Sequence, residues 1–248
     1  MESSFGEKLK VTVRGGSHEP SVGVSIQGLP AGFRPDMAAL QRFLDRRAPG
    51  GSDLTTARRE PDIPVLISGD IPDPNAAAPA AYLEFEIANT DVRRGDYDKF
   101  RDIPRPGHAD YTARLRYGSD YDMSGGGSFS GRMTAPLCVA GGLALQVLNA
   151  RGIFIEGKLL TPEADIAGAK ASRDSIGGIV ECTATGIPGG IGGSMYGGLE
   201  SRLSAILFGI PAVKGVEFGA GFRAALMKGS ENNDAFYFEN GRVKTRTN

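Results

Sequence analysis

The sequence predicts an α/β (α+β) fold, and three features of the chain support this class. Several short segments alternate apolar and polar residues, as β-strands do, whereas others repeat apolar residues at helical spacing. A strand–turn–helix pattern also occurs twice, as VGVSIQGLPAG at 22–32 and as IVECTATGIPGG at 179–190. This internal repeat favours a pseudo-symmetric α/β architecture over two unrelated domains.

The N-terminal half predicts strands that are separated by glycine-rich turns and by one helix. Alternation predicts the strands at residues 9–13, 22–26 and 83–87, and we expect a short strand at 65–68. Asp36 is a typical N-cap residue, and the apolar residues that follow it have helical spacing up to the stop at Pro49-Gly50-Gly51. Residues 70–80 are rich in proline and alanine and predict a turn.

The C-terminal half predicts three helical segments and two strands. An apolar run of small residues at 133–147 predicts a buried helix, and residues 159–172 are helix-prone. The second strand–turn–helix copy places its strand at 179–185 and its helix around 199–207, and residues 212–218 predict a further strand.

Composition narrows the class of protein. The 248 residues are 23% charged and carry a net charge of −1, which argues against binding to nucleic acid. The polar N-terminus lacks a signal sequence and no apolar run reaches the ~20 residues of a membrane helix, so we expect a cytoplasmic protein with no membrane partner. The two histidines and two cysteines exclude most metal sites, and we expect Cys138 and Cys182 to be reduced core thiols.

The stretch from Arg105 to Arg132 carries the most chemistry. It begins RPGHADY, in which Pro106 and Gly107 predict a rigid turn that presents His108. The later GGGSFSGR segment allows close backbone approach, and the hydroxyls and guanidinium that follow the glycines suit phosphate or carboxylate. A glycine-rich surface turn with an unrelated histidine is the alternative interpretation.

The other histidine also lies in a glycine-flanked turn, Gly15-Gly16-Ser17-His18-Glu19. Both turns have arginines nearby, so we expect His18 and His108 to line one cleft. The polar segment 52–64 is either a solvated loop or an active-site loop whose Arg58 and Arg59 join Arg46 and Arg47 around an anion. Spacing alone does not decide between these two interpretations.

Together these stretches resemble the chorismate synthase family. The resemblance rests on segments in family order: GGSHEPSVGVSIQGLPAG, LDRRAPGG, RREPD, NTDVRRGDY, RPGHADY with RYG, GGGSFSGRMTAP, GIPAVKGVEFGAGF and GSENND. It implies a carbon–oxygen lyase of the shikimate pathway, which makes chorismate by trans-1,4 elimination of phosphate from 5-enolpyruvylshikimate 3-phosphate. It also implies a β-α-β sandwich fold, dependence on reduced FMN with NADPH as a possible reductant, and a homotetramer.

The resemblance assigns roles to individual residues. His18 and His108 match the two catalytic histidines of the family, and Arg47 matches an arginine that grips the substrate phosphate or NADP. Ser17 and Arg132 match further substrate or NADP residues. The flavin-binding positions correspond to Ser128, Phe129, Ser130, Glu231 and Asn232.

Several features depart from the family pattern. Gly16 and Glu19 replace the family's glutamate and glycine beside His18, and Asp53 stands where many members have an arginine. Family members also continue for roughly a third of this length, and 159–172 is shorter than usual. We therefore expect 1–248 to be one domain that lacks the C-terminal third of the family. We expect this chain to bind reduced FMN at best weakly and to form no measurable chorismate. The alternative function is a non-catalytic relative that acts as an anion-binding or interaction protein.

Overall fold

The computed structural model describes residues 2–50, 60–69, 81–92, 95 and 103–246. Its contacts divide the chain into two compact units, Met1–Gly189 and Gly190–Asn248, and each unit is described by itself. The single domain over 1–248 expected from the sequence stays a prediction.

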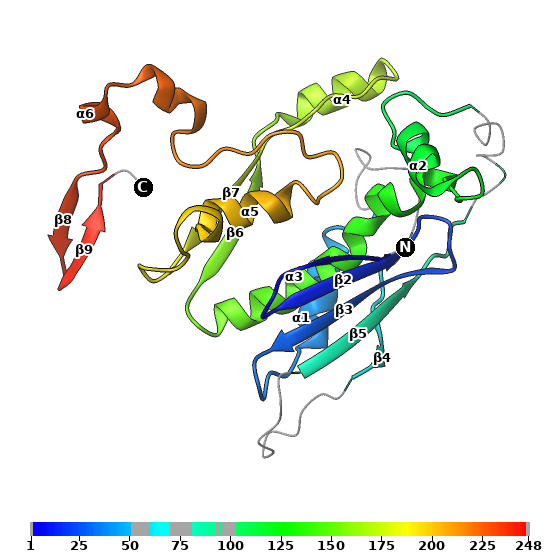
Figure 1. Ribbon diagram of the computed structural model, residues 1–248, viewed down its shortest axis with the longest axis horizontal. Coiled ribbons are helices and arrows are strands. Elements are labelled where there is room, and N and C mark those ends of the chain that lie inside the picture. The colour runs from blue at the N-terminus through cyan, green and yellow to red at the C-terminus, as the bar shows by residue number, and fades with distance from the viewer. Residues whose placement is uncertain (1, 51–59, 70–80, 93–94, 96–102, 247–248) are drawn as a thin grey trace. The chain divides into compact units, whose positions relative to one another are not determined.

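The first unit is built on a five-stranded antiparallel sheet with the strand order β1-β2-β3-β5-β4 (Figure 1). All four strands predicted for this region are present, with slightly different ends. β1 was not predicted, because its four residues are exposed and do not alternate, and only main-chain pairing with β2 makes it a strand. The five strands are β1 (Glu2–Phe5), β2 (Lys10–Gly15), β3 (Ser21–Leu29), β4 (Val65–Ser68) and β5 (Ala81–Ala88).

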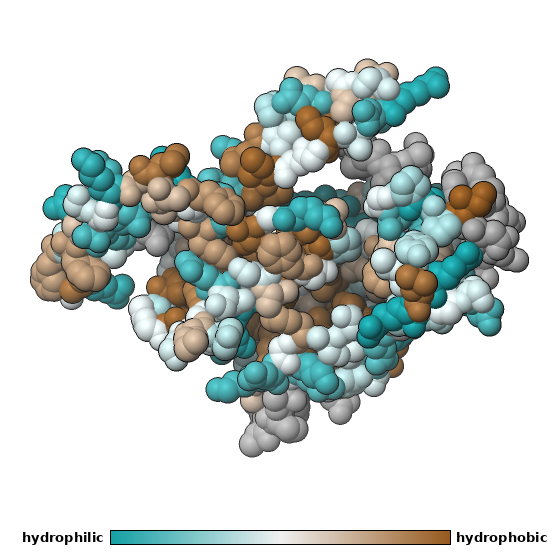
Figure 2. Space-filling view, turned by 45° about the horizontal axis from the view of Figure 1, so that its top comes forward, coloured by the Kyte–Doolittle hydropathy of each residue, from teal (hydrophilic) through white to brown (hydrophobic). Residues whose placement is uncertain are grey.

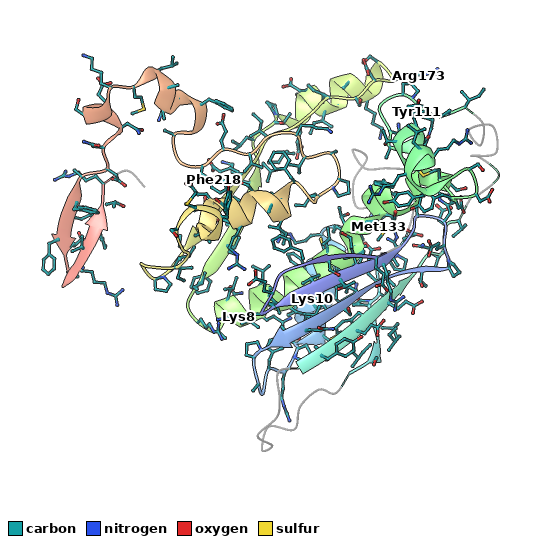
Figure 3. The ribbon with its side chains drawn as sticks, in the orientation of Figure 1. Lys8, Lys10, Tyr111, Met133, Arg173 and Phe218 are labelled. Atoms are coloured by element: carbon teal, nitrogen blue, oxygen red, sulfur yellow. The ribbon has the colours of Figure 1, made fainter. Side chains whose placement is uncertain are left out.

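One face of this sheet forms the core. The register pairs Val24 with Phe85 and Ile26 with Leu83, and all four side chains are buried. Helix α3 (Thr134–Asn149) packs on β2, β3 and β5, as expected for the apolar run at 133–147. Met133, just before this helix, belongs to the same core (Figure 3).

Helix α1 (Met37–Asp45) packs against α3 and completes the core with Leu40 and Leu44. Its predicted N-cap is confirmed, because the Asp36 carboxylate accepts a hydrogen bond of 2.9 Å from the Ala39 amide. The two helices approach closely at Gly142, where a Cβ atom would lie 2.6 Å from Leu40 Cδ1.

Among the described residues, one helical stretch, Gly131–Asn149, is long and apolar enough to cross a membrane by length and composition alone. It contains α3, whose residues Ala135, Val139 and Leu143 are fully buried in the core of the first unit. This packing on the sheet accounts for its apolar character.

The remainder of the first unit contains a second, smaller sheet and several short helices. In this sheet β6 pairs antiparallel with β7, and α4 lies in the connection between them. Strand β7 and helix α4 confirm the sequence predictions at 179–190 and 159–172, whereas β6 and α2 were not predicted. The elements are α2 (Asp110–Tyr117), η2 (Ser124–Phe129), η3 (Gly131–Met133), β6 (Phe154–Leu159), α4 (Glu163–Ala171) and β7 (Val180–Thr185).

The second unit contains helix α5 (Leu199–Leu207), as the second repeat predicts, and an unpredicted hairpin of β8 (Phe236–Glu239) and β9 (Arg242–Thr245). An Asn-Gly turn joins these strands with both residues at positive φ, the arrangement of a tight hairpin turn. The short helix η4 (Met195–Gly197) precedes α5, and η5 (Gly221–Leu226) and α6 (Gly229–Asn232) lie between α5 and β8.

The strand predicted at 212–218 is wrong. This segment follows Pro211, begins with Ala212 at φ +69, and pairs with no other strand among the described residues. Without a partner its apolar residues form an irregular connection, although their pattern is typical of a strand.

Both cysteines are free, but they lie in different surroundings. Cys138 is half-buried on α3 beside the core, and burial raises the pKa of its thiol. Cys182 is exposed on β7, so the expectation of two core thiols is wrong for this residue.

Candidate active site

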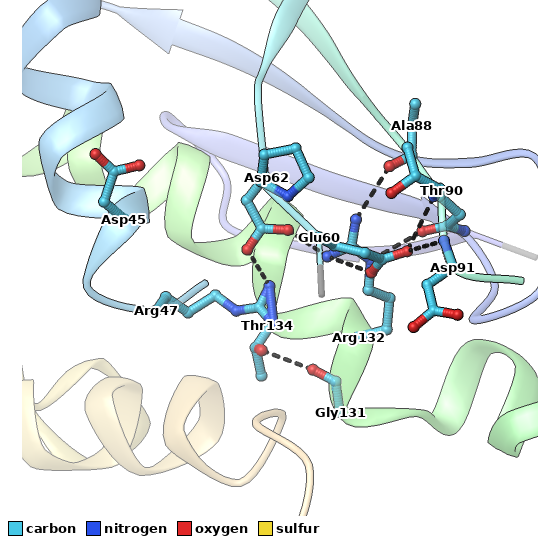
Figure 4. A network of polar contacts seen from close by, with 12 residues as sticks. Asp45, Arg47, Glu60, Asp62, Ala88, Thr90, Asp91, Gly131, Arg132 and Thr134 are labelled. Atoms are coloured by element: carbon cyan, nitrogen blue, oxygen red, sulfur yellow. Dashed lines mark hydrogen bonds and ion pairs between the residues drawn. The ribbon is translucent and has the colours of Figure 1, made fainter. Parts of the chain in front are cut away.

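Two arginines singled out from the sequence meet at one carboxylate. Asp62 is fully buried and lies between Arg47, at the end of α1, and Arg132, just before α3 (Figure 4). Arg47 Nη1 donates to Asp62 Oδ2 at 2.5 Å, and Arg132 Nη1 forms a very short ion pair with Asp62 Oδ1. The backbone of Asp62 is in the left-handed region, with φ +45, which tightly bends the segment that carries it.

Glu60 is the second buried acid of this cluster. Its Oε2 lies 3.0 Å from Arg132 Nη1, an ion pair without the alignment of a hydrogen bond. Its Oε1 accepts from the amides of Thr90 and Asp91, at 3.1 and 3.3 Å. Glu60 and Asp62 therefore balance the charges of Arg47 and Arg132, which lowers the cost of burying them.

The two arginines differ in accessibility. Arg132 has a side chain that is 2% exposed, and it also donates to Asn89 Oδ1 at 2.8 Å and to the Ala88 carbonyl at 3.3 Å. Arg47 keeps 21% of its side chain exposed. An anion arriving from solvent therefore meets Arg47 before Arg132.

His18 is buried in the turn that joins β2 to β3. Its Nδ1 lies 3.1 Å from the Ser124 carbonyl, and the neighbouring Ser17 amide donates to the Gly127 carbonyl at 3.1 Å. A carbonyl can only accept, so Nδ1 carries the proton in this contact. This tautomer leaves Nε2 as the nitrogen that can take up or release a proton.

The triple glycine explains how His18 is held. Gly125, Gly126 and Gly127 all have positive φ, and a Cβ on Gly125 would lie 2.2 Å from His18 Cε1. The predicted close backbone approach is therefore present, and the group approached is the imidazole. No sequence pattern indicated that partner, because Gly125 and His18 are more than a hundred positions apart.

The residues after the glycines lie beside an aromatic group. Ser128 Oγ and the Tyr121 hydroxyl share a hydrogen bond of 2.5 Å, and Ser130 Oγ accepts from the Arg132 amide at 3.3 Å. The Phe129 ring is exposed, with its centroid 6.4 Å from that of Tyr117. The segment thus places an exposed aromatic ring next to the glycine turn, which has no room for a side chain at Gly125 or Gly127.

His108 lies in an exposed turn before α2, and its Nδ1 is 3.1 Å from the Pro106 carbonyl. The turn is closed by Arg105, which makes two side-chain hydrogen bonds with the Asp110 carboxylate, at 2.8 and 2.9 Å. These hydrogen bonds from Arg105 hold the pKa of Asp110 below its usual value. The expectation that His18 and His108 line one cleft stays a prediction.

Asn89 is a site residue that sequence reasoning missed. It lies at the end of β5, and its Nδ2 donates to the carbonyls of Gly16 and Glu19, at 3.1 and 2.7 Å. Its Oδ1 accepts from Arg132 Nε. The side chain therefore joins the turn of His18 to the arginine cluster, a role that its place in the motif NTDVRRGDY did not reveal.

Of the residues that depart from the family pattern, two lie in this turn. A Cβ on Gly16 would lie 3.1 Å from Glu19 Oε1 and 3.3 Å from the Gly127 backbone, so the turn is tight at this position. Asp53, Arg58 and Arg59 lie outside the described residues, as does the turn expected at 70–80.

Glu231 and Asn232 belong to α6 in the second unit. Glu231 Oε2 accepts from the Lys228 amide at 2.9 Å, which caps this short helix. Their flavin role stays a prediction. Within the described ranges, no group of three or more His, Cys, Asp or Glu residues could hold a metal ion.

The chain was compared with known proteins. A family model described as chorismate synthase matches residues 9–161 and 161–248. A chorismate synthase of Lancefieldella parvula is 39% identical, with 100% of this chain and 77% of that protein covered. One of Chitinophaga pinensis is 44% identical over 98% of this chain and 74% of that protein, and one of Pyrococcus abyssi is 40% identical over 98% and 76%.

The fold agrees with this family. A crystal structure of chorismate synthase superposes with a TM-score of 0.74 at 20% identity, covering 98% of this chain and 78% of that one. The mixed α/β fold class expected from the sequence is therefore confirmed. From its sequence matches and its fold together, the chain belongs to the chorismate synthase family.

Proposed function

We propose that this chain takes part in the chorismate synthase reaction, the trans-1,4 elimination of phosphate from 5-enolpyruvylshikimate 3-phosphate. The observation that carries the proposal is the cluster in which Arg47 remains accessible while Asp62 fixes its guanidinium. A phosphorylated carboxylic acid is bound well by oriented guanidinium groups, because their paired N–H donors match its oxygens.

In this mechanism, Arg47 binds the phosphate and orients it for departure. His18, with Nδ1 bonded to the Ser124 carbonyl, presents Nε2 as the atom that gives a proton to the leaving phosphate oxygen. Glu60 and Asp62 hold Arg132 and Arg47 in place before substrate arrives, which reduces reorganisation during the reaction.

Reduced FMN would bind at the segment 128–130 and near His108 in the first unit, and Glu231 and Asn232 on α6 of the second unit are further proposed flavin residues. The exposed rings of Phe129 and Tyr117 fit a flat aromatic group. Gly127 is required by the turn itself, since a Cβ there would lie 2.7 Å from the Asp122 carbonyl oxygen. When bound, reduced FMN supplies electron density to the carbon–oxygen bond that breaks.

The finer properties belong to the same proposal. The reaction class is that of a carbon–oxygen lyase acting on phosphates, in the shikimate pathway and in the cytoplasm. NADPH is the proposed source of electrons for the flavin, and Ser17 and Arg132 are the proposed additional substrate or NADP residues. A homotetramer is the proposed assembly.

One observation favours a second candidate, an interaction protein without catalysis. Large apolar side chains are exposed on the later part of the chain, and Figure 2 shows hydrophobic residues at the surface on one face. On β6 and β7 these include Phe154, Leu159 and Val180. A surface of this kind favours association with other protein surfaces.

Anaerobic assay of the purified chain with reduced FMN and 5-enolpyruvylshikimate 3-phosphate distinguishes the two candidates. Release of phosphate together with chorismate supports catalysis. Binding of the substrate without product, together with stable self-association, supports the interaction protein.

The substitution Arg47→Ala tests the binding role directly. It removes charge-assisted hydrogen bonds to the phosphate, so calorimetry should show substrate affinity reduced at least ~tenfold, about 1.4 kcal/mol. Arg42→Ala is the matched control, because Arg42 is an exposed arginine on α1 that belongs to no proposed anion site. Equal affinities of the wild type and Arg47→Ala would reject the role of Arg47.

A further inference from the structure

We propose that Asn89 is a positioning residue that sets the place of His18 relative to the arginine cluster. The inference rests on the proposed function, in which His18 gives a proton to a phosphate held by Arg47. It concerns a residue to which neither the motifs nor the mechanism above assigns a role.

Asn89 binds the histidine turn at three points. Its Nδ2 donates to the carbonyls of Gly16 and Glu19, and its backbone amide donates to the Pro20 carbonyl at 2.9 Å. These carbonyls flank His18 on both sides in sequence. The turn is thereby attached to the end of β5, a strand of the buried sheet.

The same side chain is attached to the arginine cluster. Arg132 Nε donates to Asn89 Oδ1 at 2.8 Å, and Arg132 Nη1 forms ion pairs with Glu60 and Asp62. Asp62 in turn fixes Arg47. A continuous path of polar contacts therefore runs from the turn of His18, through Asn89 and Arg132, to the accessible guanidinium.

The chemistry of this position requires an amide. It must accept one hydrogen bond from a guanidinium and donate two to carbonyls, and a carboxylate can do only the first. Rotating the amide by half a turn would set its donors against Arg132 and its oxygen against two carbonyls, so the network determines its orientation. An aspartate of the same shape would keep the arginine contact and lose the turn.

That difference separates the two halves of the path. In Asn89→Asp, the Arg132 contact persists while the contacts to Gly16 and Glu19 are lost. In Asn89→Ala, both are lost. If Asn89 positions His18 through the turn, the two variants should change His18 alike, although they differ at Arg132.

The test is NMR of the full chain with isotope-labelled histidine. The protein has two imidazoles, so His108 is an internal reference, and His108→Gln assigns the signals. At alkaline pH the wild type should show His18 as the Nδ1–H tautomer, because the Ser124 carbonyl accepts that proton. Both Asn89 variants should change the ratio of the two His18 tautomers by about twofold or more, with little change at His108.

Glu84→Gln is the control for general loosening of the sheet. Glu84 also lies on β5 and forms an ion pair of 2.7 Å with Arg14, but it does not contact the turn. A wild-type tautomer ratio for His18 in Asn89→Asp would overturn the proposal. An equal change in Glu84→Gln would also overturn it, and since no turnover is measured, neither result depends on whether the chain makes chorismate.

Discussion

The antiparallel strand pairs β2–β3 and β6–β7 end alike but differ in their connections and surroundings. A short turn joins β2 to β3, whereas the connection from β6 to β7 contains α4. A glycine at positive φ lies at or just after the end of the second strand of each pair, Gly28 for β3 and Gly186 for β7. A Cβ on Gly28 would lie 1.8 Å from the Lys8 carbonyl oxygen, and one on Gly186 would lie 2.1 Å from that of Gly152. The repeated sequence therefore specifies a repeated backbone, down to the contact that requires glycine.

The two strand pairs differ in burial. Ile26 on β3 is 1% exposed beneath α3, whereas Val180 on β7 is 66% exposed, and every residue of β6 and β7 is exposed. The comparison shows that two strands can pair without being covered, while a core also needs a helix that covers the sheet. It also shows why the candidate site belongs to the first copy, since the turn of His18 joins two strands of a buried sheet.

The largest expected effect comes from emptying the core under α3. Ile26→Ala leaves a cavity among Leu83, α3 and their neighbours, and should lower the free energy of unfolding by about 2–5 kcal/mol. Val180→Ala on β7 should change the free energy of unfolding by less than about 0.5 kcal/mol, because the side chain is already in contact with solvent. Urea unfolding followed by circular dichroism measures both.

Equal losses in those two variants would contradict the comparison. They would mean that β6 and β7 are covered in solution, by a further protein segment or by another copy of the chain. Measuring Val180→Ala at several protein concentrations separates these cases, because only association between copies depends on concentration.

An intermediate effect is expected at the two glycines. Gly28→Ala and Gly186→Ala each force a side chain into the left-handed region, at a cost of about 1–3 kcal/mol from backbone strain alone. The strain in Gly28→Ala should lower the global unfolding midpoint. The strain in Gly186→Ala should open β6–β7 locally, which hydrogen exchange detects as faster exchange of the β7 amides at an unchanged midpoint.

The opposite pattern would show that opening of β6–β7 is coupled to global unfolding. A lowered midpoint in Gly186→Ala, with slow exchange retained in β7, would be that result. The two substitutions serve as controls for each other, since the local geometry of the two glycines is the same.

Sequence reasoning succeeded where local rules decide the structure. The strands β2, β3 and β5 follow from alternation, and α1 from the cap at Asp36, because each pattern refers to a face that the core covers. It failed for β1, which only main-chain pairing makes a strand, and for 212–218, which lacks a partner. The β8–β9 hairpin was predictable in principle from its Asn-Gly turn.

The candidate site follows the same division. Motifs pointed to Arg47 and Arg132, and the structure brings them to one carboxylate. The carboxylate itself, Asp62, and the connector Asn89 were not identified, because their partners lie 15 to 73 positions away and no local pattern encodes such contacts. The contact between Arg105 and Asp110 that closes the His108 turn was easier to predict from the sequence, since these residues are five positions apart.

The smallest expected effect concerns the two cysteines, Cys138 on α3, which covers β2 and β3, and Cys182 on β7. The thiolate is the reactive form, and burial raises the pKa of Cys138 on α3, whereas Cys182 on β7 is exposed. In native protein, a coloured disulfide reagent should therefore modify Cys182 at least about tenfold faster than Cys138, with no measurable loss of stability. Cys182→Ser should remove the fast phase and Cys138→Ser the slow one. Similar rates for the two thiols would mean that β7 is covered in solution. The contrast between the buried pair β2–β3 and the exposed pair β6–β7 would then be wrong.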